Sequence, residues 1–176
     1  MTFGSVDILG VRVDNVTVAQ ALEIIRGFVD SGRLHQVVTV NPEFVMRAQR
    51  DRAFRVVLAE ADLGLPDGYG LLWASRLLGT PLRERVAGSD LLPLIARMSA
   101  ERGYRLFLLG AGPGVAERAA EVLVGENPGL QIAGTFAGSP APEEDEAIVR
   151  RIAPTSSDIL LVAYGAPGQD KHLSKI

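Results

Sequence analysis

The sequence predicts an α/β fold: a Rossmann-like, mostly parallel sheet flanked by helices, with a small β-hairpin near the N-terminus. Short apolar strand segments alternate with helical segments along the chain, an order typical of βαβ units with parallel strands. The strand segments are almost continuously apolar, as expected when helices cover both faces of a sheet. Glycine and polar residues directly follow several of these segments.

The composition favours a single domain spanning residues 1–176. With 47% hydrophobic residues in 176, a chain of this length can form a core. The net charge is −3 and no basic tract is present, so we expect no nucleic-acid partner. There is no cysteine, which excludes disulfides and thiolate chemistry. His35 and His172 have no partner at metal-ligand spacing, so neither a metal site nor a bound cofactor is predicted.

The first elements are predicted from local signals. Residues 6–9 and 11–13 flank Gly10 and favour a hairpin. Thr17 and Gln20 then form a capping box, which predicts a helix that ends near residue 30.

A strand and two helices are expected next. The β-branched run 36–40 predicts a strand, and Asn41 followed by Pro42 begins a helix at once. A second helix is expected over 51–61, and a short strand over 63–65.

The segment 68–78 is helical in pattern and strongly apolar. We therefore expect it to be buried, either in the core or at an interface where protomers meet. Ser89 is the predicted N-cap of the following helix, which ends near Arg102.

The second half alternates strands and helices. Strands are expected at 104–109, 130–133 and 158–163, and helices at 115–124 and 142–152. The last helix carries acidic residues first and Arg150 and Arg151 last. This order complements the helix dipole, so we interpret it as a solvated helix and not as a site.

Ligands of open α/β sheets bind beyond the carboxyl ends of the strands. The candidate residues at such positions are Thr39, Asn41, Asp67, Gly110, Gly112, Gly114, Tyr164, Gly165 and Gln169.

The glycine turn 110–114 leads from a strand into a helix, a shape that can cradle a phosphate. It is a poor dinucleotide motif, because Val115 stands where the third glycine belongs. A nucleotide other than a dinucleotide is favoured, with a plain tight turn as the alternative.

Asp67 lies in a Pro-Asp-Gly turn, and Arg83 to Arg85 form an Arg-Glu-Arg cluster downstream. A carboxylate can accept a proton and an arginine can hold a phosphate. Each also has a simpler interpretation: Asp67 as the N-cap of the next helix, and the arginines as solvated loop charges.

Taken together, these blocks resemble the WecG/TagA/CpsF family of bacterial glycosyltransferases over nearly the whole chain. The blocks that carry the resemblance are Thr39–Glu43, Leu65–Gly68, Gly79–Leu82, Glu84–Val86, Gly88–Asp90, Leu108–Gly110, Pro113–Val115, Gly165–Pro167 and Gln169.

The resemblance implies an inverting, metal-independent transfer of an N-acetylmannosamine-type sugar from a UDP-sugar. The implied acceptor is a sugar linked to undecaprenyl diphosphate, used in cell-surface polymer synthesis. It further implies a cytoplasmic protein, peripheral at the inner face of the plasma membrane, that can self-associate.

The resemblance also implies roles for individual residues. Asp67 matches the general base, and Arg85 matches a residue that stabilises the diphosphate leaving group. Thr39 and Asn41 match residues lining the sugar pocket. The turn at Gly110 would hold the uridine nucleotide, with Gln169 closing the far side and Tyr164 standing where an aliphatic residue is common.

The chain ends at Ile176, whereas relatives continue with a segment that contacts the membrane and completes the active site. We therefore expect this chain to lack that segment and to be weakly active or inactive. The alternative function is a non-catalytic nucleotide-binding or assembly module, in which Asp67 is only a cap.

Overall fold

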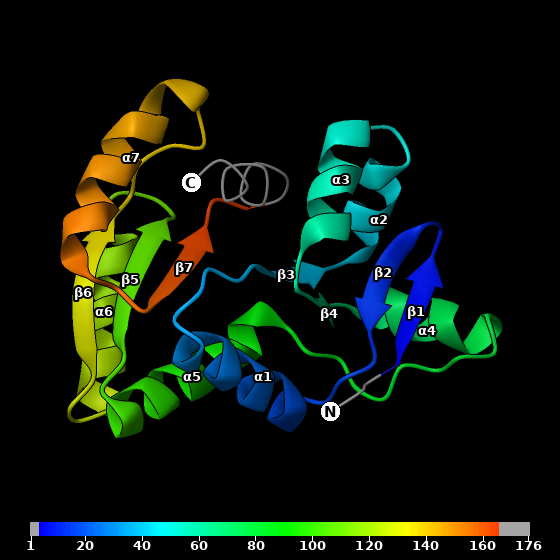
Figure 1. Cartoon of the computed structure of the whole chain (residues 1–176), viewed down its shortest axis with the longest axis horizontal. Helices are drawn as coiled ribbons and strands as arrows, with labels where there is room; N and C mark the ends of the chain where they lie inside the picture. Colours follow the sequence, from blue (N-terminus) through cyan, green and yellow to red (C-terminus); the bar gives the residue numbers. More distant parts are fainter. Residues whose placement is uncertain (1–3, 166–176) are drawn as a thin grey trace. The chain divides into compact units, whose positions relative to one another are not determined.

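The computed structural model describes residues 4–165 and shows helices packed on parallel strands, together with an antiparallel hairpin (Figure 1). The predicted α/β class is confirmed. The chain divides into two compact units, residues 1–91 and 92–176, and each has a parallel sheet of its own. That residues 1–176 act as one domain stays a prediction.

The elements of the first unit are β1 (Ser5–Ile8), β2 (Val11–Asp14), α1 (Val18–Asp30), β3 (Val37–Val40), α2 (Pro42–Ala48), α3 (Arg52–Glu60), β4 (Leu63–Pro66) and α4 (Tyr69–Leu77). Helix α5 (Gly88–Arg102) spans the boundary between the units. The second unit contains β5 (Arg105–Gly110), α6 (Val115–Glu126), β6 (Gln131–Phe136), a short 3₁₀ turn (Pro142–Glu144), α7 (Asp145–Ile152), a second 3₁₀ turn (Ala153–Thr155) and β7 (Ile159–Ala163).

The predicted hairpin is confirmed. Strands β1 and β2 pair antiparallel, with Ile8 opposite Val11. Leu9 and Gly10 both have positive φ, 53° and 77°, as a two-residue hairpin turn of type I′ requires. The buried Asp14 ties the hairpin to the first sheet, because its Oδ2 accepts a hydrogen bond of 2.7 Å from the Gly64 N–H of β4.

The predicted helix starts of α1 and α2 are also confirmed. Thr17 and Gln20 form both bonds of the capping box at α1. Asn41 Oδ1 accepts a 2.9 Å bond from the Phe44 N–H at the start of α2. Side-chain caps of this kind satisfy backbone N–H groups that have no partner within the helix.

Strands β3 and β4 pair in parallel, with Val40 opposite Pro66. A core of apolar side chains from the hairpin, β3 and helices α2, α3 and α4 packs around them; its largest fully buried members include Phe54 and Leu71. Because parallel strands end at the same edge, Asn41 and Asp67 both follow that edge directly.

The expectation that segment 68–78 is buried in the core is wrong for one face of α4, while burial at an interface between protomers stays a prediction. Leu71 and Ser75 are buried, but Tyr69, Trp73 and Leu77 are exposed. The helix is apolar on both faces, so composition alone does not show which face packs on the core.

The predicted N-cap of α5 is also wrong. The helix begins at Gly88, one residue before Ser89, and the Ser89 hydroxyl bonds the Asp90 carboxylate beside it. Backbone bonds from Asp90 and Leu91 to the Ala87 carbonyl close the first turn.

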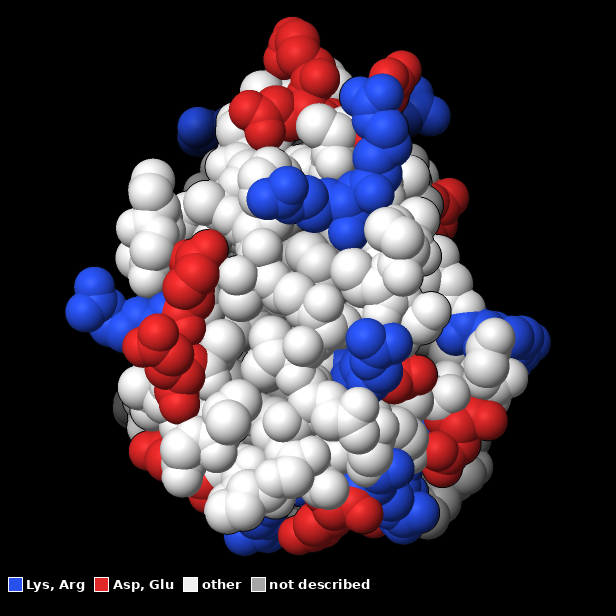
Figure 2. Space-filling model, turned by 90° about the vertical axis from the view of Figure 1, so that its left-hand side faces the viewer, with Lys and Arg blue, Asp and Glu red and all other residues white. Residues whose placement is uncertain are grey.

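In the second unit the sheet has the strand order β6-β5-β7, and both pairings are parallel. Phe107, Leu109 and Ile148 form its buried core. Helix α7 begins with acidic residues and ends with Arg150 and Arg151, as predicted. Figure 2 shows acidic and basic side chains in small groups, several of them adjacent, around a broad uncharged area on the face in view.

Within residues 4–165, every helix falls short of the length and apolar character that a membrane span needs.

Candidate active site

Asp67 follows β4 at the carboxyl edge of the first sheet. Its backbone N–H donates a 2.7 Å bond to the Val40 carbonyl, which extends the parallel pairing past the strand end. Its side chain does not cap α4, whose N-cap is Gly68 and has no side-chain capping bond. Instead the Asp67 carboxylate accepts a hydrogen bond from the Gly88 N–H at the start of α5.

Arg85 joins two carboxylates. Its Nη1 lies 3.5 Å from Asp67 Oδ1, and its Nη2 lies 2.5 Å from Asp90 Oδ2. The guanidinium carbon lies 5.5 Å from the ring centroid of Tyr69. The side chains of Arg85 and Asp67 are 30% and 28% exposed, so the pair is accessible and yet only partly screened by water.

The pKa of Asp67 is raised above the ordinary 3.8. Burial is the largest cause, and the negative charge of Asp90 acts in the same direction. The Gly88 hydrogen bond and the positive charge of Arg85 oppose this rise without cancelling it. Once ionised, such a carboxylate is a stronger proton acceptor than a solvated aspartate.

The loop between α4 and α5 holds Arg85 in place although it has no regular structure. Four of its residues are tied to other segments. The bonds are Leu82 N–H to Ser75 Oγ (3.0 Å), Val86 N–H to the Pro66 carbonyl (2.8 Å), Val18 N–H to Glu84 Oε2 (3.0 Å) and Arg83 N–H to Asn15 Oδ1 (2.9 Å). Because Glu84 and Val86 are both fixed, the backbone at Arg85 between them is fixed as well.

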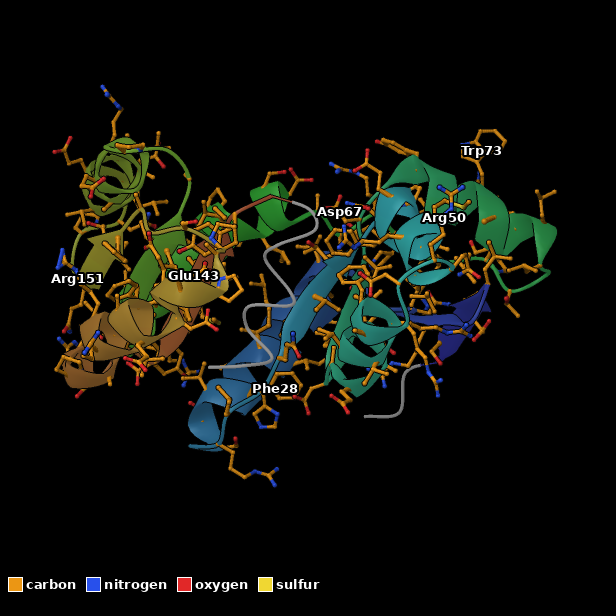
Figure 3. The ribbon with its side chains drawn as sticks, turned by 90° about the horizontal axis from the view of Figure 1, so that it is seen from above. Phe28, Arg50, Asp67, Trp73, Glu143 and Arg151 are labelled. Carbon is orange, nitrogen blue, oxygen red and sulfur yellow. The ribbon has the colours of Figure 1, made fainter. Side chains whose placement is uncertain are left out.

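Thr39 lies beside the same helix start. A Cβ placed on Gly88 would lie 3.4 Å from the Thr39 Cγ2 atom. Asn41 stands one residue beyond β3, where its side-chain oxygen caps α2; its amide nitrogen is not used by that cap. The structure thus brings Thr39, Asp67 and Arg85 together around Gly88, whereas Asn41 serves the start of α2 (Figure 3 places Asp67).

Sequence reasoning assigned no role to Asp90 or Tyr69. Asp90 is the second carboxylate on Arg85, and Tyr69 contacts the same guanidinium. The available signal for Asp90 was its place in the first turn of a predicted helix, five residues after Arg85. Tyr69 gave no signal distinct from the apolar helix around it.

The glycine turn belongs to the second unit. Gly110 has a φ of +101°, and a Cβ there would lie 2.8 Å from the Ala163 carbonyl carbon. Gly114 has a φ of +76° and begins α6 without a side-chain cap. Gly112 has neither a positive φ nor a close neighbour. Two of the three glycines are therefore required by the backbone itself.

Tyr164 packs against the buried core of the second unit, around Phe107, Leu109 and Ile148. Burial raises the pKa of its phenol, and the charge of Glu144 adds to this effect. These contacts give Tyr164 a packing role, while a role in substrate binding stays a prediction. Gln169 lies outside the described residues.

Residues 4–165 contain no cluster of three His, Asp or Glu side chains that could hold a metal ion. Near Asp67, the positive charge facing the carboxylates is the guanidinium of Arg85.

Comparison with known proteins identifies the family. Residues 6–176 match the sequence profile of the Glycosyl transferase WecG/TagA/CpsF family. The chain belongs to this family. The resemblance inferred from the short sequence blocks is thereby confirmed.

Two relatives in the WecG/TagA/CpsF family carry the name N-acetylglucosaminyldiphosphoundecaprenol N-acetyl-beta-D-mannosaminyltransferase. The one from Bacillus spizizenii is 32% identical over 148 residues, which cover 84% of this chain and 57% of the relative. The one from Staphylococcus aureus is 33% identical over 170 residues, which cover 96% of this chain and 66% of the relative. The chain thus spans less than two thirds of the length of either relative.

Several blocks that carried the resemblance to the WecG/TagA/CpsF family meet in one place. Thr39, Asp67, Arg85 and Asp90 come from four separate blocks, and all four lie around the first turn of α5.

Proposed function

We propose that this chain is an inverting glycosyltransferase that moves an N-acetylmannosamine-type sugar from a UDP-sugar to a polyprenyl-diphosphate-linked sugar. The names of the two relatives, which state transfer of an N-acetylmannosaminyl group to a diphosphoundecaprenol-linked sugar, support the donor sugar and the acceptor. Such an acceptor lies in a membrane, so we further propose a peripheral protein at the cytoplasmic face of the plasma membrane.

In the proposed reaction Asp67 is the general base. The acceptor hydroxyl oxygen attacks the anomeric carbon of the donor, and its proton passes to the Asp67 carboxylate. As the new C–O bond forms, the bond between the anomeric carbon and the diphosphate oxygen breaks, and UDP leaves with the electron pair. Attack from the side opposite UDP inverts the anomeric configuration.

Arg85 has two proposed roles in this reaction, one toward the base and one toward the leaving group. It holds Asp67 in place through a contact of 3.5 Å. A guanidinium has five N–H donors, and Arg85 is partly exposed, so the N–H groups not used by Asp67 and Asp90 can meet the diphosphate as its charge develops. Bidentate donors of this kind can do for a leaving phosphate what a metal ion does elsewhere, which supports a metal-independent reaction.

The remaining residues are proposed to bind the substrates. Thr39 and the amide nitrogen of Asn41, which the α2 cap does not use, line the sugar pocket. The turn 110–114 holds the uridine nucleotide through backbone N–H groups at the start of α6. Gln169, which lies outside the described residues, is proposed to contact the substrate.

One observation carries the proposal: the Asp67 side chain is free of α4. The non-catalytic alternative required Asp67 to cap that helix, and α4 has no side-chain cap. The carboxylate is instead oriented by Gly88 and Arg85, with its pKa raised by burial. Groups with perturbed pKa values and specific charge partners concentrate at functional sites.

The test is Asp67→Asn, because asparagine keeps an oxygen that can accept the Gly88 hydrogen bond but cannot take a proton at neutral pH. Measured in the longest native chain that contains these residues, UDP release from UDP-N-acetylmannosamine with a polyprenyl-diphosphate-linked acceptor should fall at least about 100-fold. Binding of UDP, measured by calorimetry, should be unchanged.

The control is Asp62→Asn, which removes a carboxylate of the same unit that faces His35. It should retain UDP release. Turnover by Asp67→Asn close to that of the unchanged protein would refute the role of Asp67.

A further inference from the structure

Helix α4 presents an apolar stripe to solvent. Tyr69, Trp73 and Leu77 are spaced four residues apart, and their exposed fractions are 69%, 65% and 90%. Residues at this spacing share one helix face, and the stripe extends about 12 Å at 1.5 Å per residue. Leu78, 55% exposed, continues it. The opposite face of α4 is used by the core through Leu71 and Ser75, so the stripe is not needed to fold the unit.

The chemistry of the stripe fits a lipid surface. The Arg76 guanidinium carbon lies 5.7 Å from the Trp73 ring centroid. Between residues 68 and 83 the charged side chains are Arg76 and Arg83, and no acidic residue occurs. Tyrosine, tryptophan and arginine are the residues that favour the boundary between lipid headgroups and acyl chains. An apolar helix face whose one charged side chain is Arg76 complements an anionic bilayer.

The stripe begins at the candidate active site. Tyr69 follows Asp67 by two residues, and its ring lies beneath the Arg85 guanidinium. Figure 3 shows Trp73 further along α4, with its ring pointing away from the ribbon. A surface that meets the bilayer along this stripe would therefore keep Asp67 next to it.

We propose that the α4 stripe rests on an anionic lipid bilayer and sets Asp67 at the height of an acceptor sugar anchored there. The proposal rests on the proposed function, because it takes the acceptor to be linked to a membrane lipid. It adds the element that makes contact: Trp73 and Leu77 enter the headgroup region, and Arg76 meets the lipid phosphates.

The binding test uses Trp73, the single tryptophan of the chain. With vesicles of phosphatidylglycerol and phosphatidylcholine, its fluorescence should shift to the blue, and lipids brominated on the acyl chain should quench it. The shift should weaken at high salt, because screening removes the attraction between arginine and phosphate. Absence of a shift with anionic vesicles would overturn the proposal.

Two leucines allow a matched comparison, because Leu77 and Leu34 are both 90% exposed and both belong to the first unit. Leu77→Glu should weaken vesicle binding about tenfold or more, since it puts a charge where the proposal places an apolar side chain in the headgroup region. Leu34→Glu should leave binding unchanged. Equal effects of the two substitutions would show that vesicle binding does not depend on the stripe.

The alternative binding partner for the α4 stripe is a second copy of the chain. In that case the Trp73 shift would appear without vesicles and grow with protein concentration, and sedimentation would show a dimer that Leu77→Glu abolishes. That outcome would overturn the lipid assignment.

The proposal can fail independently of the proposed function, because vesicle binding is measured without substrates. Leu77→Glu should retain UDP release with a short-chain, water-soluble acceptor and lose it with an acceptor embedded in vesicles. Loss with both acceptors, in a variant that still folds, would assign Leu77 to the reaction itself and contradict a lipid contact.

Discussion

The ionised form of the Asp67 carboxylate is stabilised by two neighbouring groups and destabilised by its other surroundings. The Gly88 N–H and Arg85 stabilise the ionised form, while burial and Asp90 destabilise it more strongly. The net result is a raised pKa, which suits a group that must accept a proton and release it again. The contacts with Gly88 and Arg85 fix the orientation of the side chain, and its pKa nevertheless stays raised.

Gly110 supports a prediction at the residue scale. Its φ is +101°, and an added Cβ would lie 2.8 Å from the Ala163 carbonyl carbon, which is backbone and cannot move aside easily. Gly110→Ala should therefore lower the free energy of unfolding by about 1–3 kcal/mol. Urea denaturation measures this.

Gly112→Ala is the control, because an added Cβ at Gly112 meets no atom closer than 3.7 Å and its φ is not positive. Its effect should stay within about 0.5 kcal/mol. Equal losses of stability in both variants would show that the close approach of Gly110 to β7 is not the reason why the turn needs glycine there.

Contacts between residues close in the sequence could be predicted from it, whereas contacts between distant residues could not. The caps at Thr17 and Asn41 depend on residues three positions away, so the sequence displays both partners. The pair of Asp67 and Arg85 joins residues 18 positions apart across α4 and a loop. Their contact was not expected, because the family resemblance implied only a separate role for each residue.

At the scale of elements, the loop from α4 to α5 depends on Ser75. This fully buried side chain donates to the Leu72 carbonyl at 2.8 Å and accepts from the Leu82 N–H at 3.0 Å. Ser75→Ala leaves the Leu82 N–H buried without this partner, which should cost about 1–3 kcal/mol of unfolding free energy. Because the loop carries Arg85, UDP release should fall as well.

Ser89→Ala tests the specificity of that effect, because the Ser89 hydroxyl is exposed and bonds its neighbour Asp90. Its thermal midpoint should change by less than about 2 °C. A Ser75→Ala variant as stable as Ser89→Ala would mean that the loop does not depend on the Ser75 bond.

Helix α4 shows where sequence patterning stops being informative. Its existence was predicted, but the exposure of Tyr69, Trp73 and Leu77 was not. Apolar residues occupy both faces, and the choice of the buried face depends on which one meets the core around Phe44 and Leu58. That choice is a property of the tertiary structure.

At the scale of the whole molecule, the alternation of strands and helices predicted one mostly parallel sheet. The described strands outside the hairpin do pair in parallel, but they form two sheets, β3-β4 and β6-β5-β7. The division of the described strands between two units was not expected. Which strands pair across long connections cannot be read from neighbouring residues in the sequence. The turn and cap residues that end each element can be recognised there.

The response of stability to pH is a further whole-molecule prediction. At Asp62 burial tends to raise the pKa, but hydrogen bonds from the Gln36 N–H and His35, together with the positive charges of His35 and Arg12, outweigh it, so the pKa is lowered below 3.8. The stability from Asp62 is therefore present above pH 3.8 and lost as the pH falls through the folded pKa. Asp67 has the opposite sign: its raised pKa gives stability below pH 3.8 that is lost as the pH rises through the folded pKa.

Thermal unfolding at neutral and at acidic pH measures both effects. Asp62→Asn should lower the midpoint at neutral pH, and the difference should shrink in acid. Asp67→Asn should leave the neutral midpoint unchanged or raise it, with the difference again shrinking in acid. A large loss of neutral stability in Asp67→Asn would show that the ionised carboxylate serves the fold.

The central claim is that Asp67 is the titrating base, and the pH dependence of kcat/KM for UDP release tests it most directly. The acid limb should have its midpoint above 3.8, because the pKa of Asp67 is raised. Asp90→Asn removes a charge that raises this pKa and should move the limb to lower pH, whereas Arg85→Gln removes a charge that lowers it and should move the limb to higher pH. An acid limb that neither substitution moves would contradict the assignment of Asp67 as the base.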